Sequence, residues 1–459
     1  MATRRSPDRV AIFAHIADQT EGQHHFVPAG LLDREQAASD QETVSFAYGL
    51  RYLKRSEAFD IDPRSLDLAR AKVHPGMRWF PSPALGEFGG IRDAAPDAWG
   101  RRVIEAVLKA PPNSLDEFTY LLEAGSDRVG ALDVRQRLDS PPQRTAAELV
   151  SLPYLLQAAA AVDAGEPVPA NLVPYLHGAP SAGGARPKAS VRDEAGVLWL
   201  AKFPAKNDAY EMAIVEAGAM DLARAAGMTV PPLQVISVAG QRVLLIRRFD
   251  RYWALPGEPL PAFARGYDTQ PVKGATEGRI PQVSALTMMD CPEMDSASKS
   301  YRDLAQAIRE RVHPACITSD NEELFARMVL NIFVTNDDDH LRNHAFSYDP
   351  ELSGWRLSPL YDVVPRPSFA HERRLHLSVG TQGKLATLDN AMSEFPAFVA
   401  DRPAALNVIR RVWGAVRGWK TVFEARGATP ALIAILESAI RPLRDIASPA
   451  LERDIRRTA

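Results

Sequence analysis

The stretch that decides the interpretation of this chain is Asn336-Asp337-Asp338-Asp339-His340-Leu341-Arg342-Asn343. Three adjacent carboxylates repel one another, so the stretch is either a solvated loop or a site that holds a metal ion. It directly follows a strongly apolar helix predicted over Glu322–Val334, so it emerges from a core. Asp338 and Asn343 also have the Asp-x-x-x-x-Asn spacing of kinase catalytic loops, in which the Asp accepts the proton of the substrate hydroxyl and the Asn holds Mg²⁺.

A further carboxylate, Asp362, lies in the stretch Leu357–Asp362, beyond two short runs that predict a β-hairpin, Phe346–Tyr348 and Trp355–Leu357. A carboxylate just past such a hairpin would lie beside the acidic stretch. Mg²⁺ favours one or two carboxylates together with phosphate oxygens and water, so Asp362 and Asn343 would suffice as its protein ligands. The alternative is an ordinary turn after a proline.

An ion pair is predicted between Lys202 and Glu216. Lys202 continues the apolar face of a strand predicted over Val197–Phe203, and Glu216 falls inside the apolar stripe of a helix predicted over Ala209–Ala226. An unpaired charge on a buried face is costly, so the two side chains should pair. In kinases such a pair orients the lysine onto the ATP phosphates; the alternative is an ordinary salt bridge at the edge of a core.

A loop of small residues, Ser181–Lys188, precedes the first strand of this middle region. Small residues let backbone N–H groups approach phosphates closely, as nucleotide-binding loops do. No Gly-Lys-Ser/Thr follows at the Walker spacing, which excludes a P-loop NTPase. Taken alone, such a loop is as compatible with a linker as with a nucleotide site.

Composition excludes several classes of protein. The chain has 459 residues, long enough for two or three domains, and its 46% hydrophobic and 24% charged residues exclude a mainly disordered chain. A net charge of -3 argues against a wholly basic nucleic-acid binder. Two cysteines exclude a disulfide framework and a four-cysteine zinc site. No apolar stretch approaches the ~18 residues of a membrane helix, so we expect a cytoplasmic protein without membrane contact.

Stretches rich in Pro and Gly near residues 140–180 and 253–281 suggest boundaries within the chain. We therefore predict an accessory N-terminal α/β subdomain over 1–175, a β-rich lobe over 176–255 and a helical lobe over 256–459. The β-rich lobe should hold two hairpins, with a turn at Asp193–Gly196 in the first. In the helical lobe, Ser319 and Glu322 predict a capping box that opens the apolar helix.

Together these motifs resemble the HipA family of serine/threonine kinases, the toxins of HipA–HipB-type toxin–antitoxin pairs. The resemblance covers nearly the whole chain and is carried by the stretches Arg92–Asp97, Ser126–Ala131, Ser181–Lys188, Lys202–Pro204, Gly227–Pro231, Arg248–Arg251, Asp338–Ser347 and Pro359–Asp362. It implies an α+β fold of the two-lobed kinase type, with an α/β N-terminal domain, which includes the accessory subdomain, and an all-helical C-terminal domain.

The resemblance also implies roles for individual residues. Asp338 is the catalytic base, His340 shapes its loop, and Asn343 and Asp362 bind Mg²⁺. The expected contacts with ATP come from the small-residue loop, from the Lys202–Glu216 pair, from backbone groups that bind adenine and from the catalytic and metal loops: Ala182, Gly183, Gly184, Lys202, Glu216, Arg247, Phe249, His340, Asn343 and Asp362. Ser181 matches the serine that such kinases autophosphorylate to switch themselves off.

This sequence departs from the family pattern at three places. Asp339 stands where a glycine is common and adds a charge beside the base. Arg186-Pro187 replaces a more usual polar and acidic pair in the small-residue loop, and Arg247 replaces an acidic residue of the adenine-binding strand. The first two departures bear on the base and on the autophosphorylation switch.

The function implied by the resemblance is that of a type II toxin: an ATP- and Mg²⁺-dependent protein kinase that phosphorylates a translation component such as an aminoacyl-tRNA synthetase and arrests growth, producing persistence. The implied partners are a HipB-like helix-turn-helix antitoxin and, through it, operator DNA. Residues 407–459 carry ten Lys and Arg against five Asp and Glu, and such a basic tail either touches phosphates or is a solvated helical face. The alternatives are a small-molecule kinase and a non-catalytic corepressor that acts with the antitoxin.

Overall fold

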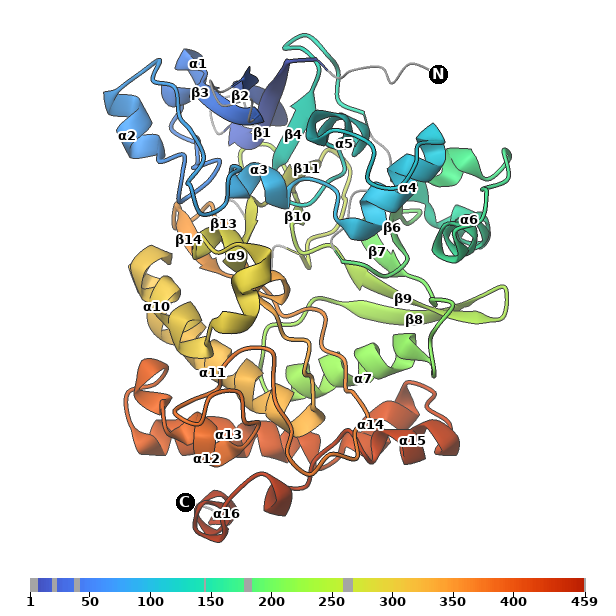
Figure 1. Ribbon diagram of the computed structural model, residues 1–459, viewed down its shortest axis with the longest axis vertical. Helices are drawn as coiled ribbons and strands as arrows, with labels where there is room; N and C mark the ends of the chain where they lie inside the picture. The colour runs from blue at the N-terminus through green and yellow to red at the C-terminus, as the bar shows by residue number, and fades with distance from the viewer. Residues whose placement is uncertain are drawn as a thin grey trace. The chain divides into compact units, whose positions relative to one another are not determined.

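The computed structural model describes residues 7–18, 23–36, 42–143, 146–176, 184–258 and 267–457 (Figure 1). The chain forms two compact units, and each is assembled from separate stretches of sequence. Unit 1 consists of Met1–Asn207, Ile236–Val283 and Ser347–Ser353, and unit 2 consists of Asp208–Val235, Ser284–Phe346 and Gly354–Ala459. The three consecutive domains expected from the sequence are a different kind of division and stay a prediction.

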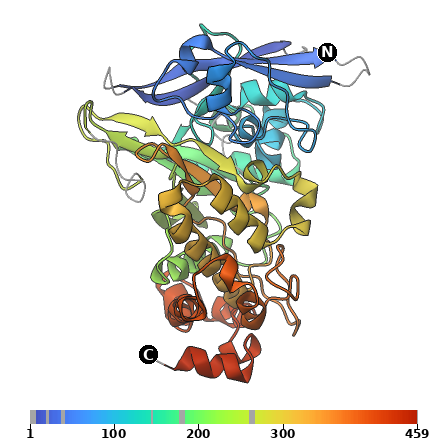
Figure 2. The same ribbon diagram turned by 90° about the vertical axis from the view of Figure 1, so that its left-hand side faces the viewer.

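Unit 1 opens with an antiparallel four-stranded sheet whose strand order is β3-β2-β1-β4. The long strands β1 to β3 run side by side in Figures 1 and 2. Every second residue of β1, from Val10 to Ile16, enters one apolar cluster, as the period of two along a strand requires. The strands are β1 (Arg9–Asp18), β2 (Gln23–Gln36), β3 (Glu42–Tyr48) and β4 (Leu132–Arg135).

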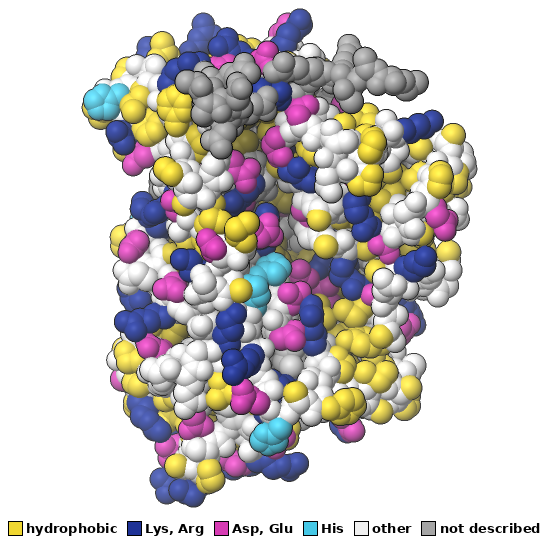
Figure 3. Space-filling model, viewed as in Figure 1, with side chains coloured by type: hydrophobic (Ala, Val, Ile, Leu, Met, Phe, Trp, Pro, Cys, Tyr) yellow, Lys and Arg dark blue, Asp and Glu magenta, His cyan; other side chains and the backbone are white. Residues whose placement is uncertain are grey.

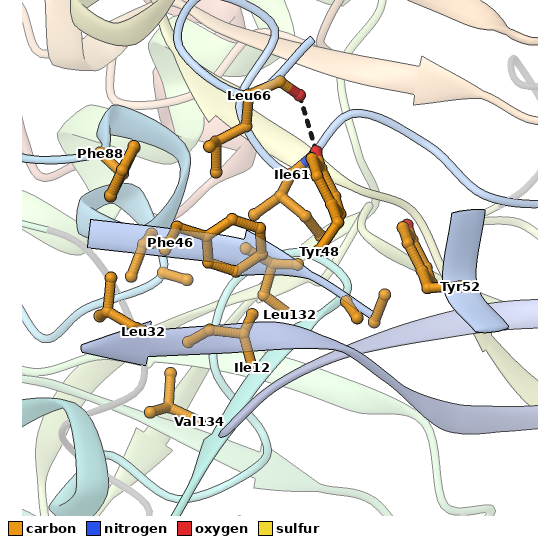
Figure 4. Close-up of a cluster of buried hydrophobic side chains, with 14 of the residues drawn as sticks. Ile12, Leu32, Phe46, Tyr48, Tyr52, Ile61, Leu66, Phe88, Leu132 and Val134 are labelled. Atoms are coloured by element: carbon orange, nitrogen blue, oxygen red, sulfur yellow. Dashed lines mark hydrogen bonds between the residues drawn. The ribbon is translucent and has the colours of Figure 1, made fainter. Parts of the chain in front are cut away.

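Short helices and loops cover the buried face of this sheet. Figure 4 shows side chains from the sheet, such as Ile12 and Phe46, packed against Phe88 and Leu66 from the segments that follow. The buried hydroxyl of Tyr48 is tolerated because it donates to the carbonyl of Leu66 at 2.7 Å (Figure 4). The helices of this part are α1 (Leu50–Leu53), α2 (Leu68–Val73), α3 (Gly89–Asp93) and α5 (Glu117–Glu123).

A second, five-stranded sheet of order β5-β6-β7-β9-β8 confirms the two hairpins predicted for the middle of the chain. The first hairpin turns at Asp193–Gly196: Gly196 has φ +87°, and Asp193 Oδ1 accepts from the amides of Ala195 and Val197. Its elements are β5 (Ala147–Glu148), β6 (Lys188–Arg192), β7 (Leu198–Lys202), β8 (Leu233–Val238) and β9 (Gln241–Arg247), with α4 (Ala98–Leu108), the 3₁₀ turn η1 (Leu149–Ser151) and α6 (Leu152–Ala164) packed on the sheet.

A buried ionic cluster joins these two parts of unit 1. Asp250 accepts from the amide of Gly130 at 2.7 Å and from the guanidinium groups of Arg248 (2.5 Å) and Arg251 (2.7 Å). Both arginines also donate to the carbonyl of Arg128, at 3.2 and 2.8 Å. Burial alone would raise the pKa of Asp250, but the two arginines hold it well below its ordinary value. Two stretches 120 residues apart are therefore bonded to each other.

The same cluster extends to the hairpin of β10 (Arg251–Ala254) and β11 (Thr276–Arg279). Arg192 of β6 binds Glu277 of β11 at 2.9 Å and the fully buried Asp127 at 3.0 Å. Arg279 donates to the carbonyl of Ser126. Buried charges are stable only when paired, and here each carboxylate faces at least one arginine.

Unit 2 is mainly helical. Helix α11 lies at its centre and packs against α10 and α13, while α7 packs against α13 and α14. Gly218 of α7 is needed for this packing, because a Cβ there would lie 2.8 Å from the ring of Phe423. The helices are α7 (Met212–Ala225), α9 (Ala285–Met288), α10 (Tyr301–Arg311), α11 (Ile317–Val334), α12 (Leu388–Met392), α13 (Arg402–Val416), α14 (Trp419–Ala425), α15 (Pro430–Leu436) and α16 (Pro449–Arg456).

Three short strands form a sheet of order β12-β13-β14: β12 (Gln282–Ser284), β13 (Ala345–Asp349) and β14 (Gly354–Leu357). The hairpin predicted from the two runs before Asp362 is confirmed as β13 and β14. Short 3₁₀ turns connect the helices: η3 (Glu293–Ser298), η4 (Pro314–Cys316), η5 (Leu341–Asn343), η6 (Phe395–Ala397) and η7 (Leu443–Asp445). Within the described residues, no helix has both the length and the apolar character needed to cross a membrane.

The predicted capping box at Ser319 and Glu322 is wrong. Helix α11 begins at Ile317, because the turn at Pro314–Cys316 leads directly into it, and Cys316 occupies the N-cap position. Ser319 lies within the first turn, where its hydroxyl donates to the carbonyl of Cys316 at 3.0 Å. A capping box occurs instead at the start of α10, between Ser300 and Asp303.

The buried cluster around Asp250 leads to a stability prediction. Asp250→Asn keeps the shape of the side chain but leaves Arg248 and Arg251 without their shared negative charge. Removing one partner of a buried ion pair costs about 3–5 kcal/mol. We expect a loss of that size in the free energy of unfolding, measured by urea denaturation.

The matched control is Asp139→Asn, since Asp139 pairs with Arg137 in solvent at 2.9 Å and both side chains are at least 70% exposed. It should change the unfolding free energy by less than about 0.5 kcal/mol. Equal stability of the Asp250 and Asp139 variants would contradict a structural role for the cluster.

Candidate functional site

The acidic stretch leaves helix α11 at a fixed point. Thr335 adopts a left-handed conformation (φ +52°) that ends the helix, and its hydroxyl donates to the carbonyl of Ala439 at 2.6 Å. The next residue, Asn336, is buried and donates both its amide and its side chain to Asn331, at 3.0 Å each. The start of the loop is thus held by the helix that precedes it.

The three carboxylates have different environments, so the run does not behave as a single unit. Asp337 and Asp338 are about half exposed, whereas Asp339 is buried. Oδ2 of Asp339 accepts from the Tyr301 hydroxyl at 2.5 Å and from the Asn331 side chain at 2.7 Å. No group of three or more His, Cys, Asp or Glu side chains that could hold a metal occurs in the described part of the chain.

Asp339 also lies 3.0 Å from Nε2 of His344. Burial would raise the pKa of Asp339, but the nearby His344 and the hydrogen bonds from His344 and Tyr301 keep it below its ordinary value. The residue that stands in place of a common glycine therefore anchors the loop from inside. It ties the end of α11, the start of α10 and the loop itself to one buried oxygen.

Asp338 projects from this anchored loop toward solvent. The side-chain amide of Asn343 donates to the backbone carbonyl of Asp338 at 3.0 Å, so the two ends of the Asp-x-x-x-x-Asn spacing are bonded. Arg366 donates to Oδ2 of Asp338 at 2.7 Å and contacts Oδ1 of Asp337 at 3.1 Å. Burial raises the pKa of Asp337 above its ordinary value despite this arginine.

Asn343 and Asp362 are brought to neighbouring loops of unit 2. Asn343 lies in η5, and the hydroxyl of Tyr361, next to Asp362, donates to the carbonyl of Arg342 at 2.7 Å. Asp362 has φ +60°, a left-handed conformation that Asp and Asn adopt more readily than other non-glycine residues. Since the amide nitrogen of Asn343 is committed to Asp338, its side-chain oxygen is the atom left to act as a ligand. One carboxylate and one amide oxygen on adjacent loops fit Mg²⁺ completed by phosphate and water.

His340 lies at the edge of this loop. Its ring packs edge-on against His376, with ring centroids 5.8 Å apart. The hydroxyl of Ser296 accepts from the amide of Leu341 and lies 3.1 Å from Nε2 of His376. Burial, and then the neighbouring His340, lower the pKa of His376. The role of His340 in shaping the loop stays a prediction.

The other predicted ATP contacts lie largely in unit 1. Lys202 is half-buried at the end of β7, and Arg247 at the end of β9 is buried and donates to the carbonyl of Thr269. Phe249 is the second residue beyond the end of β9. Glu216 is buried on α7 in unit 2, as its place in the apolar stripe predicted. The Lys202–Glu216 ion pair itself stays a prediction.

Ser181, Ala182 and Gly183 lie outside the described residues, so their roles also stay predictions. Gly184 is described and has φ +111°, and a Cβ there would lie 2.2 Å from the ammonium nitrogen of Lys188. Lys188 is buried, with its ammonium 3.8 Å from the Asp97 carboxylate that caps α4. Glycine at this end of the small-residue loop is therefore favoured by the backbone conformation, since side chains rarely adopt a φ of +111°.

Sequence reasoning missed four residues of this site: Tyr301, Asn331, His344 and Arg366. Asn331 did carry a signal, because it is polar within the apolar run of α11, and the logic applied to Glu216 would have asked for its partner. Tyr301 and Arg366 are distant in sequence from the residues they bind, and nothing around them indicated the contact.

Residues 180–419 match the family model described as the HipA-like C-terminal domain. A chain in the solved complex of the Shewanella oneidensis toxin–antitoxin proteins HipA and HipB with operator DNA is similar over 97% of this chain and 95% of its own length, with a TM-score of 0.60 and 13% identity. At that identity the likeness shows the fold alone, and it confirms the expected α+β, two-lobed kinase-like class.

Two further proteins are similar over part of the chain. The Helicobacter pylori proinflammatory kinase CtkA aligns with 61% of this chain and 95% of its own, with a TM-score of 0.40 and 13% identity. A Sinorhizobium fredii protein, Y4mE, whose name describes it as a kinase, is 26% identical over 218 residues, which are 46% of this chain. The match spans 44% of that curated relative, less than half its length.

The buried carboxylate of Asp339 leads to a pH-dependent prediction. Its folded-state pKa is lowered, so its contribution to stability is fully present above the unfolded-state pKa of about 3.9 and is lost as the pH falls through the folded-state value. At pH 7, Asp339→Asn should lower the free energy of unfolding by about 3–5 kcal/mol. The difference between parent and variant should shrink below about pH 4.

Urea denaturation between pH 3 and pH 7 measures this difference. Asp454→Asn is the control, because Asp454 pairs with Arg402 at the surface, and it should differ from the parent by less than about 0.5 kcal/mol at every pH. A gap for Asp339→Asn that stays constant over this range would show that its charge is not what stabilises the loop.

Proposed function

This chain belongs to the family of proteins with a HipA-like C-terminal domain, and from that premise we propose that it is an ATP- and Mg²⁺-dependent serine/threonine protein kinase that acts as the toxin of a type II toxin–antitoxin pair. The observation that carries the proposal is the loop around Asp338. A half-exposed carboxylate stands on a loop anchored by a buried one, with Asn343 bonded to its backbone and the Asp362 loop bonded alongside.

The proposed reaction is transfer of the γ-phosphoryl group of ATP to a Ser or Thr hydroxyl. Asp338 orients the hydroxyl and takes its proton as the oxygen bonds to phosphorus and ADP leaves. Asn343 and Asp362 would hold Mg²⁺, which neutralises charge on the phosphates when bound. Lys202, oriented by Glu216, contacts the phosphates, and His340 keeps the loop in shape.

The remaining nucleotide contacts in this proposal follow the family resemblance. Backbone groups of Arg247 and Phe249 bind adenine, and Ala182, Gly183 and Gly184 approach the phosphates. Ser181 is the autophosphorylation site whose modification switches the enzyme off. The division into an accessory subdomain, a β-rich lobe and a helical lobe belongs to the same proposal.

The proposed partners are a HipB-like helix-turn-helix antitoxin and operator DNA reached through it, with a protein substrate such as an aminoacyl-tRNA synthetase. Support comes from family membership and from the similarity in fold to one chain of the solved complex of HipA, HipB and operator DNA. On the face drawn in Figure 3, basic and acidic side chains are interspersed, which agrees with DNA contact through the complex rather than through a uniformly basic surface on that face.

A small-molecule kinase and a corepressor without catalysis remain as alternatives with different products. Mass spectrometry after brief expression separates the three, since it detects a new phosphoprotein, a phosphorylated metabolite or neither. The intact set of Asp338, Asn343 and Asp362 favours catalysis over the corepressor.

Asp338→Asn tests the kinase. The variant keeps the size of the side chain and loses proton acceptance, and general base catalysis is worth about 10²–10⁴-fold in rate. We expect phosphorylation and growth arrest to fall by that factor, with the thermal midpoint of the parent retained. The control is Asp337→Asn, which changes the neighbouring carboxylate that also contacts Arg366 and should keep activity within about threefold. If Asp338→Asn still arrests growth at the parent level, Asp338 is not the catalytic base.

Asp362→Asn tests the metal site. Asparagine tolerates the left-handed conformation of Asp362, so the substitution isolates the charge that balances the cation. Mg²⁺-ATP at about 100 times its Kd should stabilise the parent by about 2.7 kcal/mol, and this stabilisation should shrink or vanish in the variant. Thermal denaturation with and without Mg²⁺-ATP measures it, and an unchanged shift would place the metal elsewhere.

A further inference from the structure

Arg366 is bonded to the end of helix α11 by both its backbone and its side chain. Its amide donates to the carbonyl of Thr335 at 3.2 Å. Its guanidinium donates to Oδ2 of Asp338 at 2.7 Å and contacts Oδ1 of Asp337 at 3.1 Å. All of these groups lie in unit 2, and Arg366 is only four positions beyond Asp362.

The segment that carries Arg366 is held in place. Pro365 and Pro367 flank the residue and restrict its backbone. A few residues on, the guanidinium of Arg373 donates to the hydroxyl of Thr335 and to the carbonyls of Ser368 (2.8 Å) and Ser438 (2.7 Å). Arg366 is thus presented to Asp338 from a fixed backbone, although its side chain is 48% exposed.

The contact leaves Asp338 able to act. A carboxylate has two oxygens, and Arg366 binds Oδ2, so Oδ1 can accept the hydroxyl proton. In the transfer, the hydroxyl oxygen bonds to the γ-phosphorus, the bond to the bridging oxygen of ADP breaks, and the proton passes to Asp338. The attacking oxygen lies within hydrogen-bond distance of Asp338, so the phosphoryl group passes close to the cation bound to the other carboxylate oxygen.

The chemistry of arginine suits that position. A planar guanidinium binds phosphoryl oxygens through two parallel N–H groups, and it stays charged at all physiological pH values. Arginines that contact a transferring phosphoryl group stabilise the charge spread over its equatorial oxygens. Since half of the Arg366 side chain faces solvent, N–H groups are accessible to an incoming phosphoryl group.

We propose that Arg366 is a further catalytic residue, which orients Asp338 through Oδ2 and contacts the γ-phosphoryl group during transfer. This inference rests on the proposed function of the same loop. In this proposal Arg366 supplies a positive charge beside the proposed base Asp338.

The test compares Arg366→Gln, Arg366→Lys and Arg366→Ala with Arg374→Gln. Arg374 is a matched control because it lies on the same segment and its side chain, which is 70% exposed, pairs with Glu372. The reactions are hydrolysis of Mg²⁺-ATP, with water as acceptor, and incorporation of radiolabelled γ-phosphate into the full-length chain. The Kd for Mg²⁺-ATP is measured separately by thermal shift.

We expect Arg366→Gln to lower the rate at saturating ATP by about 10²–10³-fold, as the loss of one transition-state donor does, with less than a threefold change in Kd. The rate of Arg366→Lys should lie between those of the parent and Arg366→Gln, because lysine supplies the positive charge but not the two parallel N–H donors of a guanidinium. Guanidinium ion at millimolar concentration should partly restore Arg366→Ala and leave the parent and Arg374→Gln unchanged. A purely structural role would not produce this rescue.

Several results would overturn the inference. If Arg366→Gln reacts at the parent rate, Arg366 has no catalytic role. If Arg366→Gln reacts faster than the parent, the contact of Arg366 with Asp338 inhibits the reaction. If Arg366→Gln fails to fold, an unrescued Arg366→Ala that retains the parent thermal midpoint decides against the proposal. If the parent shows no ATP-dependent phosphoryl transfer, or if Asp338→Asn does not impair that transfer, the proposed function is overturned as well. If the parent is active and Asp338→Asn is inactive, a negative result at Arg366 contradicts only the role proposed for Arg366.

Discussion

The arrangement of the candidate site depends on one buried oxygen, Oδ2 of Asp339. A buried carboxylate is tolerated only when donors satisfy it, and here the donors come from α10, from α11 and from the far side of the loop. Meeting that requirement fixes the residue before Asp339, which is Asp338, and the residue before His344, which is Asn343. The spacing that marks a catalytic loop in the sequence is thus held by groups that take no part in the chemistry.

Unit 1 follows the same rule with Asp250. Its carboxylate accepts hydrogen bonds from Arg248, Arg251 and the amide of Gly130. The motifs Ser126–Ala131 and Arg248–Arg251, which are far apart in the sequence, therefore form one buried cluster. This accounts for the residue types in both: the arginines reach backbone carbonyls of the partner stretch, and glycine at position 130, with φ +76°, lets the backbone turn there. These contacts hold the four-stranded sheet and the five-stranded sheet together.

Local patterns in the sequence were enough to predict much of the fold. The two hairpins of the middle region form as β6–β7 and β8–β9, the hairpin before Asp362 forms as β13–β14, and the turn at Asp193–Gly196 lies where it was expected. Glu216 is buried as its helical spacing indicated. The start of α11 was predicted too late, because a local cap pattern at Ser319 was outweighed by a proline turn that runs into the helix. The different environments of Asp337, Asp338 and Asp339 depend on partners up to 38 positions away in the sequence, so no local sequence pattern could predict them.

The contact between Arg366 and Asp338 contributes little to the free energy of unfolding. Ion pairs between side chains as exposed as these contribute about 0–1 kcal/mol, and holding an arginine side chain in one geometry costs entropy. Even so, two prolines, a backbone hydrogen bond to Thr335 and the anchoring of Arg373 all restrict the segment that presents it. Restraint of this kind around a weak contact is expected where geometry matters more than binding energy, as the proposed role of Asp338 as the base facing a reacting hydroxyl requires.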